Sequence, residues 1–285
     1  MLLRTLGITG SGPGPDSPAS TYLVQVGPEE IRAAKAAGTV PESVEERQWN
    51  LVLDLGNGGF AAIQRHINPF DIDAVALTHL HQDHCADLSG LYVYLKYHPE
   101  RGSAATGTTV QLPVYGPTAV SERVEEMCGI SDGASLGSVY QFWPTRNSTP
   151  FNVNLGPIHI QPFHMNHTVE TFGLRITAPS ALRPGEIATL AYSGDTDYCH
   201  GAVNLARDAD VFLCEAAFVE GRDDGMTGVH LTGKRAGRVA AEAQAKSLLL
   251  THIPVWNDPA VTLAEASETY TGPTALAVPD GEYQI

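Results

Sequence analysis

Three histidines and one aspartate fall within six residues of the sequence, in the segment THLHQDH of residues 78–84. The segment directly follows a short apolar stretch that is typical of a buried strand. Alternate residues at the end of a strand project to the same side, so His79 and His81 can bind one metal ion. The chain must then turn, which brings Asp83 and His84 toward a second position. Imidazole and carboxylate ligands suit zinc, manganese or iron; the alternative is a histidine-rich polar turn on the surface.

Further side chains of this kind stand at the ends of later apolar stretches. His167 follows a strand-like stretch and a short turn, Asp195 ends the run AYSGD, and His252 ends the run LLLTH. Polar residues at strand ends assemble sites on one rim of an α/β sheet. Each alone could equally be a structural histidine or a helix-capping aspartate, and His164 competes with His167. Together with residues 78–84, the set predicts a metal centre.

The pattern His79-x-His81-x-Asp83-His84, followed in order by His167, Asp195 and His252, resembles the signature of the metallo-β-lactamase superfamily. The resemblance implies an α/β (α+β) chain folded as a four-layer αββα sandwich with two divalent metal ions, zinc first, with manganese or iron as alternatives. It implies one metal on His79, His81 and His167, the other on Asp83, His84 and His252, and Asp195 as the bridge. Some β-lactamases carry cysteine at the bridging position, and flavodiiron oxidoreductases carry glutamate where this chain has His81. These differences favour hydrolysis over redox chemistry.

Longer stretches resemble ribonuclease Z and, more closely, the actinobacterial cyclic-nucleotide phosphodiesterases related to it. They span nearly the whole chain: residues 14–20, 88–91, 97–99, 170–176, 190–196, 210–216 and 248–256. The ribonuclease Z motifs that match Glu215 and His230 are thought to relay a proton to the leaving group. The resemblance therefore implies that His230, oriented by Glu215, protonates the O3′ oxygen that leaves when a 3′,5′-cyclic phosphate is opened. The alternative for Glu215 is a buried carboxylate at the end of a strand.

The charge balance of the chain disfavours a polyanionic partner. The sequence has 285 residues, with 17 Lys+Arg against 32 Asp+Glu, a formal net charge of −15. Long nucleic acids are held by a surplus of basic residues, and the basic arm with which ribonuclease Z holds transfer RNA has no counterpart. No apolar run approaches the roughly 18 residues of a membrane span. The four cysteines are scattered and no signal peptide is evident, so we expect a soluble cytoplasmic protein.

The elements that must position the site are read from apolar runs and turn residues. Strand-like runs dominate the first half, and helices alternate with short apolar strands in the second half, which suits layered sheets with helices outside. We expect one domain over residues 1–285, with a loop at residues 101–108. Residues 28–48 are rich in Glu, Arg and Ala and are interpreted as a partly helical insertion, for which a lid over the site or a dimer contact is expected.

The ligand pattern together with the resemblance implies a dinuclear metal phosphodiesterase that hydrolyses 3′,5′-cyclic AMP to 5′-AMP by attack of a metal-bound hydroxide, with Asp83 orienting or deprotonating the nucleophile. The expected substrate is a small cyclic nucleotide, and a homodimer without membrane or long nucleic-acid partners is expected. No substrate-binding residue is predicted. The alternatives are a ribonuclease Z-type endonuclease, a lactonase or thioesterase using the same metals, and a metal-binding scaffold without turnover.

Overall fold

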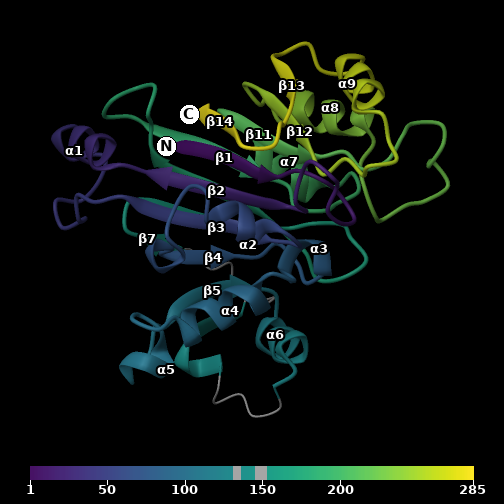
Figure 1. The fold of residues 1–285 in the computed structure, drawn as a ribbon. Coiled ribbons are helices and arrows are strands. Elements are labelled where there is room, and N and C mark those ends of the chain that lie inside the picture. Colours follow the sequence, from purple (N-terminus) through teal and green to yellow (C-terminus); the bar gives the residue numbers. More distant parts are fainter. Residues whose placement is uncertain (131–135, 145–152) are drawn as a thin grey trace.

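The computed structural model describes residues 1–130, 136–144 and 153–285, and these ranges contain a pair of seven-stranded sheets that face each other (Figure 1). The first sheet has the order β14-β1-β2-β3-β4-β5-β6. Its strands are β1 Leu2–Gly7, β2 Thr21–Val26, β3 Trp49–Leu55, β4 Ala74–Ala76, β5 Leu112–Gly116, β6 Tyr140–Pro144 and β14 Gly281–Gln284. The second sheet has the order β13-β12-β11-β10-β9-β8-β7. Its strands are β7 Val153–Leu155, β8 Ile158–His164, β9 Phe172–Pro179, β10 Ile187–Tyr192, β11 Val211–Glu215, β12 Leu248–Thr251 and β13 Thr274–Leu276.

Alternation along the strands divides the apolar residues between an inner core and two outer cores. In β3, Leu51 and Leu53 belong to the core between the sheets, whereas Val52 faces the helices of the first sheet. Those helices are α2 Gly59–Ile63, α4 Leu88–Tyr97 and α6 Val120–Cys128, and the second sheet is covered by α7 His200–Ala206, α8 Gly233–Glu242 and α9 Pro259–Ser267. The result is the αββα sandwich, which confirms the predicted fold class.

Short elements complete the described chain. They are α1 Pro28–Ala36, α3 Gln82–Cys85, α5 Ser103–Thr106 and the 3₁₀ turns Pro69–Asp71 and Leu136–Ser138. The expectation of a plain loop at residues 101–108 is therefore wrong, because the small residues of α5 form one helical turn. No helix in the described ranges is long and apolar enough to cross a bilayer.

Residues 28–48 lie at the opposite end of the sandwich from the predicted metal ligands. Helix α1 occupies the end of the molecule away from α3, which carries Asp83 and His84 (Figure 1). This follows from the pairing, since β2 runs antiparallel to β3 and its last residue, Val26, pairs with Trp49 at the start of β3. The expected lid over the site is therefore wrong. The dimer contact stays a prediction.

Candidate metal centre

The predicted ligands meet at one rim of the sandwich, where parallel strands of both sheets end. Strands β3 and β4 run parallel in the first sheet, and β10, β11 and β12 run parallel in the second. The loops after β4, β10 and β12 carry His79, Asp195 and His252, and the loop after β8 carries His167. Carboxyl ends of parallel strands form the usual position of a site in such sheets.

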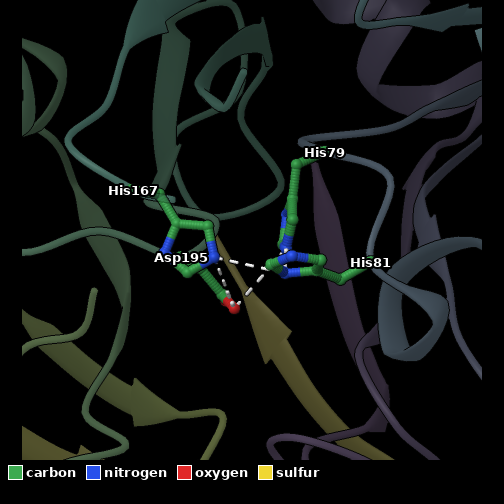
Figure 2. Close-up of side chains that lie close together, drawn as sticks. All are labelled: His79, His81, His167 and Asp195. Carbon is green, nitrogen blue, oxygen red and sulfur yellow. Dashed lines mark hydrogen bonds and ion pairs between the residues drawn. The ribbon is translucent and has the colours of Figure 1, made fainter. Parts of the chain in front are cut away.

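The first ligand group consists of His79, His81, His167 and Asp195. Figure 2 shows His79 and His81 on one blue segment of the chain and His167 and Asp195 on green ones. The Nδ1 of His81 lies 3.0 Å from the Nε2 of His79 and 3.2 Å from the Nε2 of His167. Asp195 Oδ2 lies 3.6 Å from the Nε2 of His79 and 4.0 Å from that of His167. Tetrahedral zinc with bonds of about 2.1 Å separates its ligands by roughly 3.4 Å, so the four atoms lie near the corners of such a site.

The second ligand group consists of Asp83, His84, His252 and again Asp195. The Nε2 of His84 lies 3.6 Å from Asp83 Oδ2 and 3.2 Å from Asp195 Oδ1. The Nε2 of His252 lies 3.8 Å from Asp83 Oδ2 and 3.3 Å from Asp195 Oδ2. Asp195 therefore belongs to both groups, in the place of a bridging carboxylate.

Unpaired buried atoms at the centre indicate that the residues fit bound cations. Within the described ranges of the chain, His84 Nε2, His252 Nε2 and Asp195 Oδ1 are buried and have no hydrogen-bond partner. Leaving a buried polar atom unsatisfied costs roughly 1–3 kcal/mol, and native proteins rarely do so without an ion, a water or a function. A divalent cation would accept the lone pairs of all three atoms.

Oxygen atoms outside the ligand groups lie within hydrogen-bond distance of the Nδ1 atom in most of these histidine rings. The Nδ1 of His252 lies 3.0 Å from Ser20 Oγ, and the Nδ1 of His167 lies 2.7 Å from the carbonyl oxygen of Val229. The Nδ1 of His79 lies 3.1 Å from Thr78 Oγ1. A hydrogen bond from Nδ1–H fixes the tautomer that leaves the Nε2 lone pair free for a metal.

Asp54 is a buried positioning residue that the sequence did not reveal. Its Oδ1 accepts from the backbone N–H of Thr78 at 2.7 Å, and its Oδ2 accepts from Thr78 Oγ1 at 2.8 Å, Tyr192 OH at 2.7 Å and His84 Nδ1 at 2.7 Å. The residue is fully buried and has a left-handed φ of 53°. The available signal was a charged residue inside the apolar run NLVLDL of residues 50–55, which in a buried strand requires several partners.

In the metal-free centre, the pKa values of the histidines are shifted in different directions. Burial lowers the pKa of His79, with a further lowering from His84, and burial also lowers the pKa of His252. Burial acts in the same direction on His84, but the carboxylates of Asp195 and Asp54 outweigh it and raise its pKa. Burial opposes ionisation of Asp195, yet His252 and His84 hold its pKa well below the usual range.

A third group, made by Asp195, Glu215 and His230, adjoins the two ligand groups. The Nδ1 of His230 lies 2.9 Å from Glu215 Oε1 and 3.9 Å from Asp195 Oδ2. Glu215 is fully buried at the end of β11 and also accepts from the backbone N–H groups of Thr196 and Ala217. Burial alone would lower the pKa of His230, but Glu215 outweighs it and raises that pKa to about 9. The predicted pair is thus in hydrogen-bond contact beside the ligand groups.

The centre forms the floor of a cavity of about 390 Å³. Its lining is Ser11, His81, Gln82, Asp83, Arg123, His167, Thr168, Asp195, Val229, His230 and His252. The loop that carries Ser11 approaches the predicted ligand His252 closely, because a Cβ on Gly10 would lie 2.2 Å from the carbonyl oxygen of His252. His164 lies outside the ligand groups, with its ring packed on Phe172 at a centroid distance of 4.8 Å.

Comparison with known proteins defines the class to which this fold and site belong. Residues 50–253 match the family model described as a β-lactamase superfamily domain. The chain belongs to this superfamily, and its αββα fold with clustered histidine and aspartate ligands is that of the metal-dependent hydrolases within it.

The relatives place the chain among proteins similar to YhfI and ribonuclease Z. It is 38% identical over 288 residues to the uncharacterized protein Rv1339 of Mycobacterium tuberculosis, with 99% of this chain and 92% of that protein covered. It is 27% identical over 277 residues to "Probable metallo-hydrolase YhfI" of Bacillus subtilis, with 97% of each covered. The crystal structure of YhfI matches with a TM-score of 0.78 at 23% identity, covering 100% of this chain and 99% of that one. Ribonuclease Z of Bacillus thuringiensis is 27% identical over 255 residues, covering 74% of this chain and 80% of that protein.

Proposed function

We propose that this protein is a dinuclear metal-dependent phosphodiesterase that opens 3′,5′-cyclic AMP to 5′-AMP. The observation that carries the proposal is the Glu215–His230 pair placed beside two ligand groups that share Asp195. Two divalent cations, zinc in the first place, would supply an activated water and would neutralise the phosphoryl oxygens. The protein's own residues supply the rest of the chemistry.

His230 is placed to act as the general acid. Expulsion of O3′ from a cyclic phosphate produces an alkoxide, which needs a proton as the bond breaks. Glu215 holds the Nδ1 of His230, so the other ring nitrogen remains to donate a proton to the substrate oxygen in the cavity. A backbone-anchored carboxylate behind the imidazole keeps the ring in one orientation and stabilises its protonated form.

Asp83 completes the proposed arrangement on the nucleophile side of the cavity. Its carboxylate lines the cavity and belongs to the second ligand group, with its Oδ2 3.6 Å from the Nε2 of His84 and 3.8 Å from that of His252. A carboxylate there accepts a hydrogen bond from the attacking water and aligns it for in-line attack opposite O3′.

A ribonuclease Z-type endonuclease is the second candidate. The observation that favours it is the 27% identity to ribonuclease Z of Bacillus thuringiensis, and the same acid and ligand groups would serve a linear diester. The net charge of −15 opposes this candidate, because binding of a long polyanion depends on cationic side chains that displace counterions.

Product analysis tests the proposal. Zinc- or manganese-loaded protein is incubated with 3′,5′-cyclic AMP, and the product is identified by chromatography. We expect 5′-AMP from the wild type and no 5′-AMP from Asp195→Ala. The control His164→Ala, at a histidine outside the ligand groups, should keep the wild-type rate. No turnover by protein with bound metal would overturn the proposal. Cleavage of a transfer RNA precursor or of a lactone by the same sample would then assign the second candidate or a carboxylic ester hydrolase.

A further inference from the structure

Among the described residues, one arginine and no lysine line the metal cavity, and this arginine comes from the helical layer of the first sheet. This residue is Arg123 of α6, which faces the same cavity as His81, Asp195 and His230. Its position is unexpected in a chain with a net charge of −15. The mechanism proposed above gives this residue no role.

The guanidinium of Arg123 has unused hydrogen-bonding capacity. Its Nε is buried and has no hydrogen-bond partner within the described ranges. Its Nη1 lies 3.4 Å from a carboxylate oxygen of Glu126, whose side chain is 71% exposed, so this ion pair contributes little. The Arg123 side chain itself is 36% exposed. A guanidinium presents five N–H donors in a planar fork, so donors remain beside the Glu126 contact for an acceptor in the cavity.

Core packing and a hydrogen-bonded turn hold in place the helix that carries Arg123. Val120 and Val124 of α6 are buried in the outer core of the first sheet. The turn before α6 is bound to the second half of the chain, since Thr118 donates from its backbone N–H and its hydroxyl to the carboxylate of Glu170, at 2.8 and 3.1 Å. Glu170 lies three residues after His167. Arg123 is therefore held on a helix that is tied to the loop of a predicted ligand.

The guanidinium of Arg123 also interacts with the thiol of Cys85. The Sγ of Cys85 is directed at the carbonyl oxygen of His81 at 3.2 Å, so these contacts place the guanidinium next to the segment of residues 79–84 that supplies four of the predicted ligands. Arg123 therefore lines the same cavity as members of both ligand groups.

We propose that Arg123 binds the anionic phosphoryl group of the substrate and thereby selects phosphoric esters over neutral carboxylic esters and lactones. This inference rests on the proposed function and names the group that recognises its substrate class. A guanidinium pairs with two oxygens of a phosphoryl group through parallel hydrogen bonds. Such a contact orients the phosphorus for attack, whereas a neutral ester has no charge with which to form it.

The first test measures binding without turnover. Inorganic phosphate is titrated into metal-loaded protein by calorimetry. A hydrogen bond to a charged group is worth roughly 1.5–3 kcal/mol, so Arg123→Gln should weaken phosphate binding on the order of 10- to 100-fold. Arg123→Lys, which keeps the charge without the fork, should lose less.

A matched control separates local recognition from the loss of one positive charge. Arg207 is exposed and contacts Asn204. It lies before the first residue of β11, whereas the predicted metal ligands lie beyond the carboxyl ends of the strands, at the other end of the sheet. Arg207→Gln makes the same charge change and should leave phosphate affinity unchanged. Equal affinity in wild type and Arg123→Gln, with equal metal content and melting temperature, would overturn the proposal.

The second test compares substrates of different charge. Arg123→Gln should raise KM for an anionic phosphodiester such as bis-p-nitrophenyl phosphate and leave hydrolysis of neutral p-nitrophenyl acetate unchanged. An equal loss on both substrates would show a merely structural role and refute the inference. If cyclic AMP is not hydrolysed but phosphate binding still depends on Arg123, the proposed function fails and the anion site stands. If cyclic AMP is hydrolysed and phosphate binding ignores Arg123, only the inference fails.

Discussion

Replacing Asp54 by asparagine should lower the metal affinity of the centre without touching a ligand. One oxygen of Asp54 accepts from Thr78 Oγ1, Tyr192 OH and His84 Nδ1, and the other accepts from the backbone N–H of Thr78. An amide oxygen can take only one of these two positions. The amide nitrogen then directs N–H groups at existing donors, so at least one donor–donor contact forms inside a fully buried network.

The size of the effect follows from the number of bonds that change. A buried donor left unsatisfied costs about 1–3 kcal/mol, and bonds to an ionised acceptor are roughly twice as strong as neutral ones. Breaking a buried charged network typically costs roughly 3–5 kcal/mol. Loss of an outer partner of a metal-bound histidine lowers metal affinity by roughly 10- to 100-fold. We expect both losses in Asp54→Asn, because His84 is no longer held with its Nε2 toward the second ligand group.

Zinc affinity is measured by competition with a fluorescent chelator, and stability by urea unfolding of the metal-free protein. Asp73→Asn is the matched control, because Asp73 accepts from the backbone N–H of Asn50 at 2.7 Å and pairs with Arg47, at the opposite end of the same sheet. The control should lose stability and keep its zinc affinity. Wild-type zinc affinity in Asp54→Asn would refute the reasoning.

Three further predictions concern pH, metal removal and the core. The pKa of His230 is about 9 in the metal-free fold, above its unfolded value of about 6.5. Protonated His230 therefore adds up to about 3 kcal/mol to the free energy of unfolding; this stabilisation is complete below pH 6.5 and is lost as the pH rises through 9. Urea unfolding across this range should show that loss in the wild type and not in His230→Gln. Chelation should lower the melting temperature by roughly 5–10 °C for each metal ion lost, because metal at 100 times its Kd adds about 2.7 kcal/mol per site. An unchanged melting temperature would contradict the ligand assignment. Leu190→Ala, in the core between the sheets, should cost about 2–5 kcal/mol in urea unfolding and leave zinc stoichiometry unchanged.

Strands and helices with strong local signals could be predicted from the sequence to within a residue or two. The apolar residues of segment 88–97 predict a buried helix, and this helix is α4. The apolar runs before Asp195 and His252 are β10 and β12. Elements without such signals were missed. Strand β14 has the polar sequence GEYQ and forms only by pairing with β1, and α7 is a seven-residue helix whose buried face becomes visible only in the fold.

The site shows the same division between local and tertiary information. His167, Asp195 and His252 can be predicted as metal ligands from the sequence. Their side chains are of the types that bind metal ions, and each residue follows an apolar run that forms a strand. Asp54 and Arg123 are not, because their roles depend on distant groups. Asp54 is 138 residues from Tyr192 in sequence, and only the packing of α6 shows which polar residue of that helix faces the cavity.

The most direct test of the central claim is hydrolysis of 3′,5′-cyclic AMP in ¹⁸O-labelled water, followed by mass spectrometry of the product. Attack of a single activated water at phosphorus predicts 5′-AMP with one ¹⁸O atom in its phosphate, formed by metal-loaded protein and not after chelation. Label on the ribose, or unlabelled 3′-AMP, would show cleavage at another bond or by another route. Either result, or no product from metal-loaded protein, would contradict a two-metal phosphodiesterase.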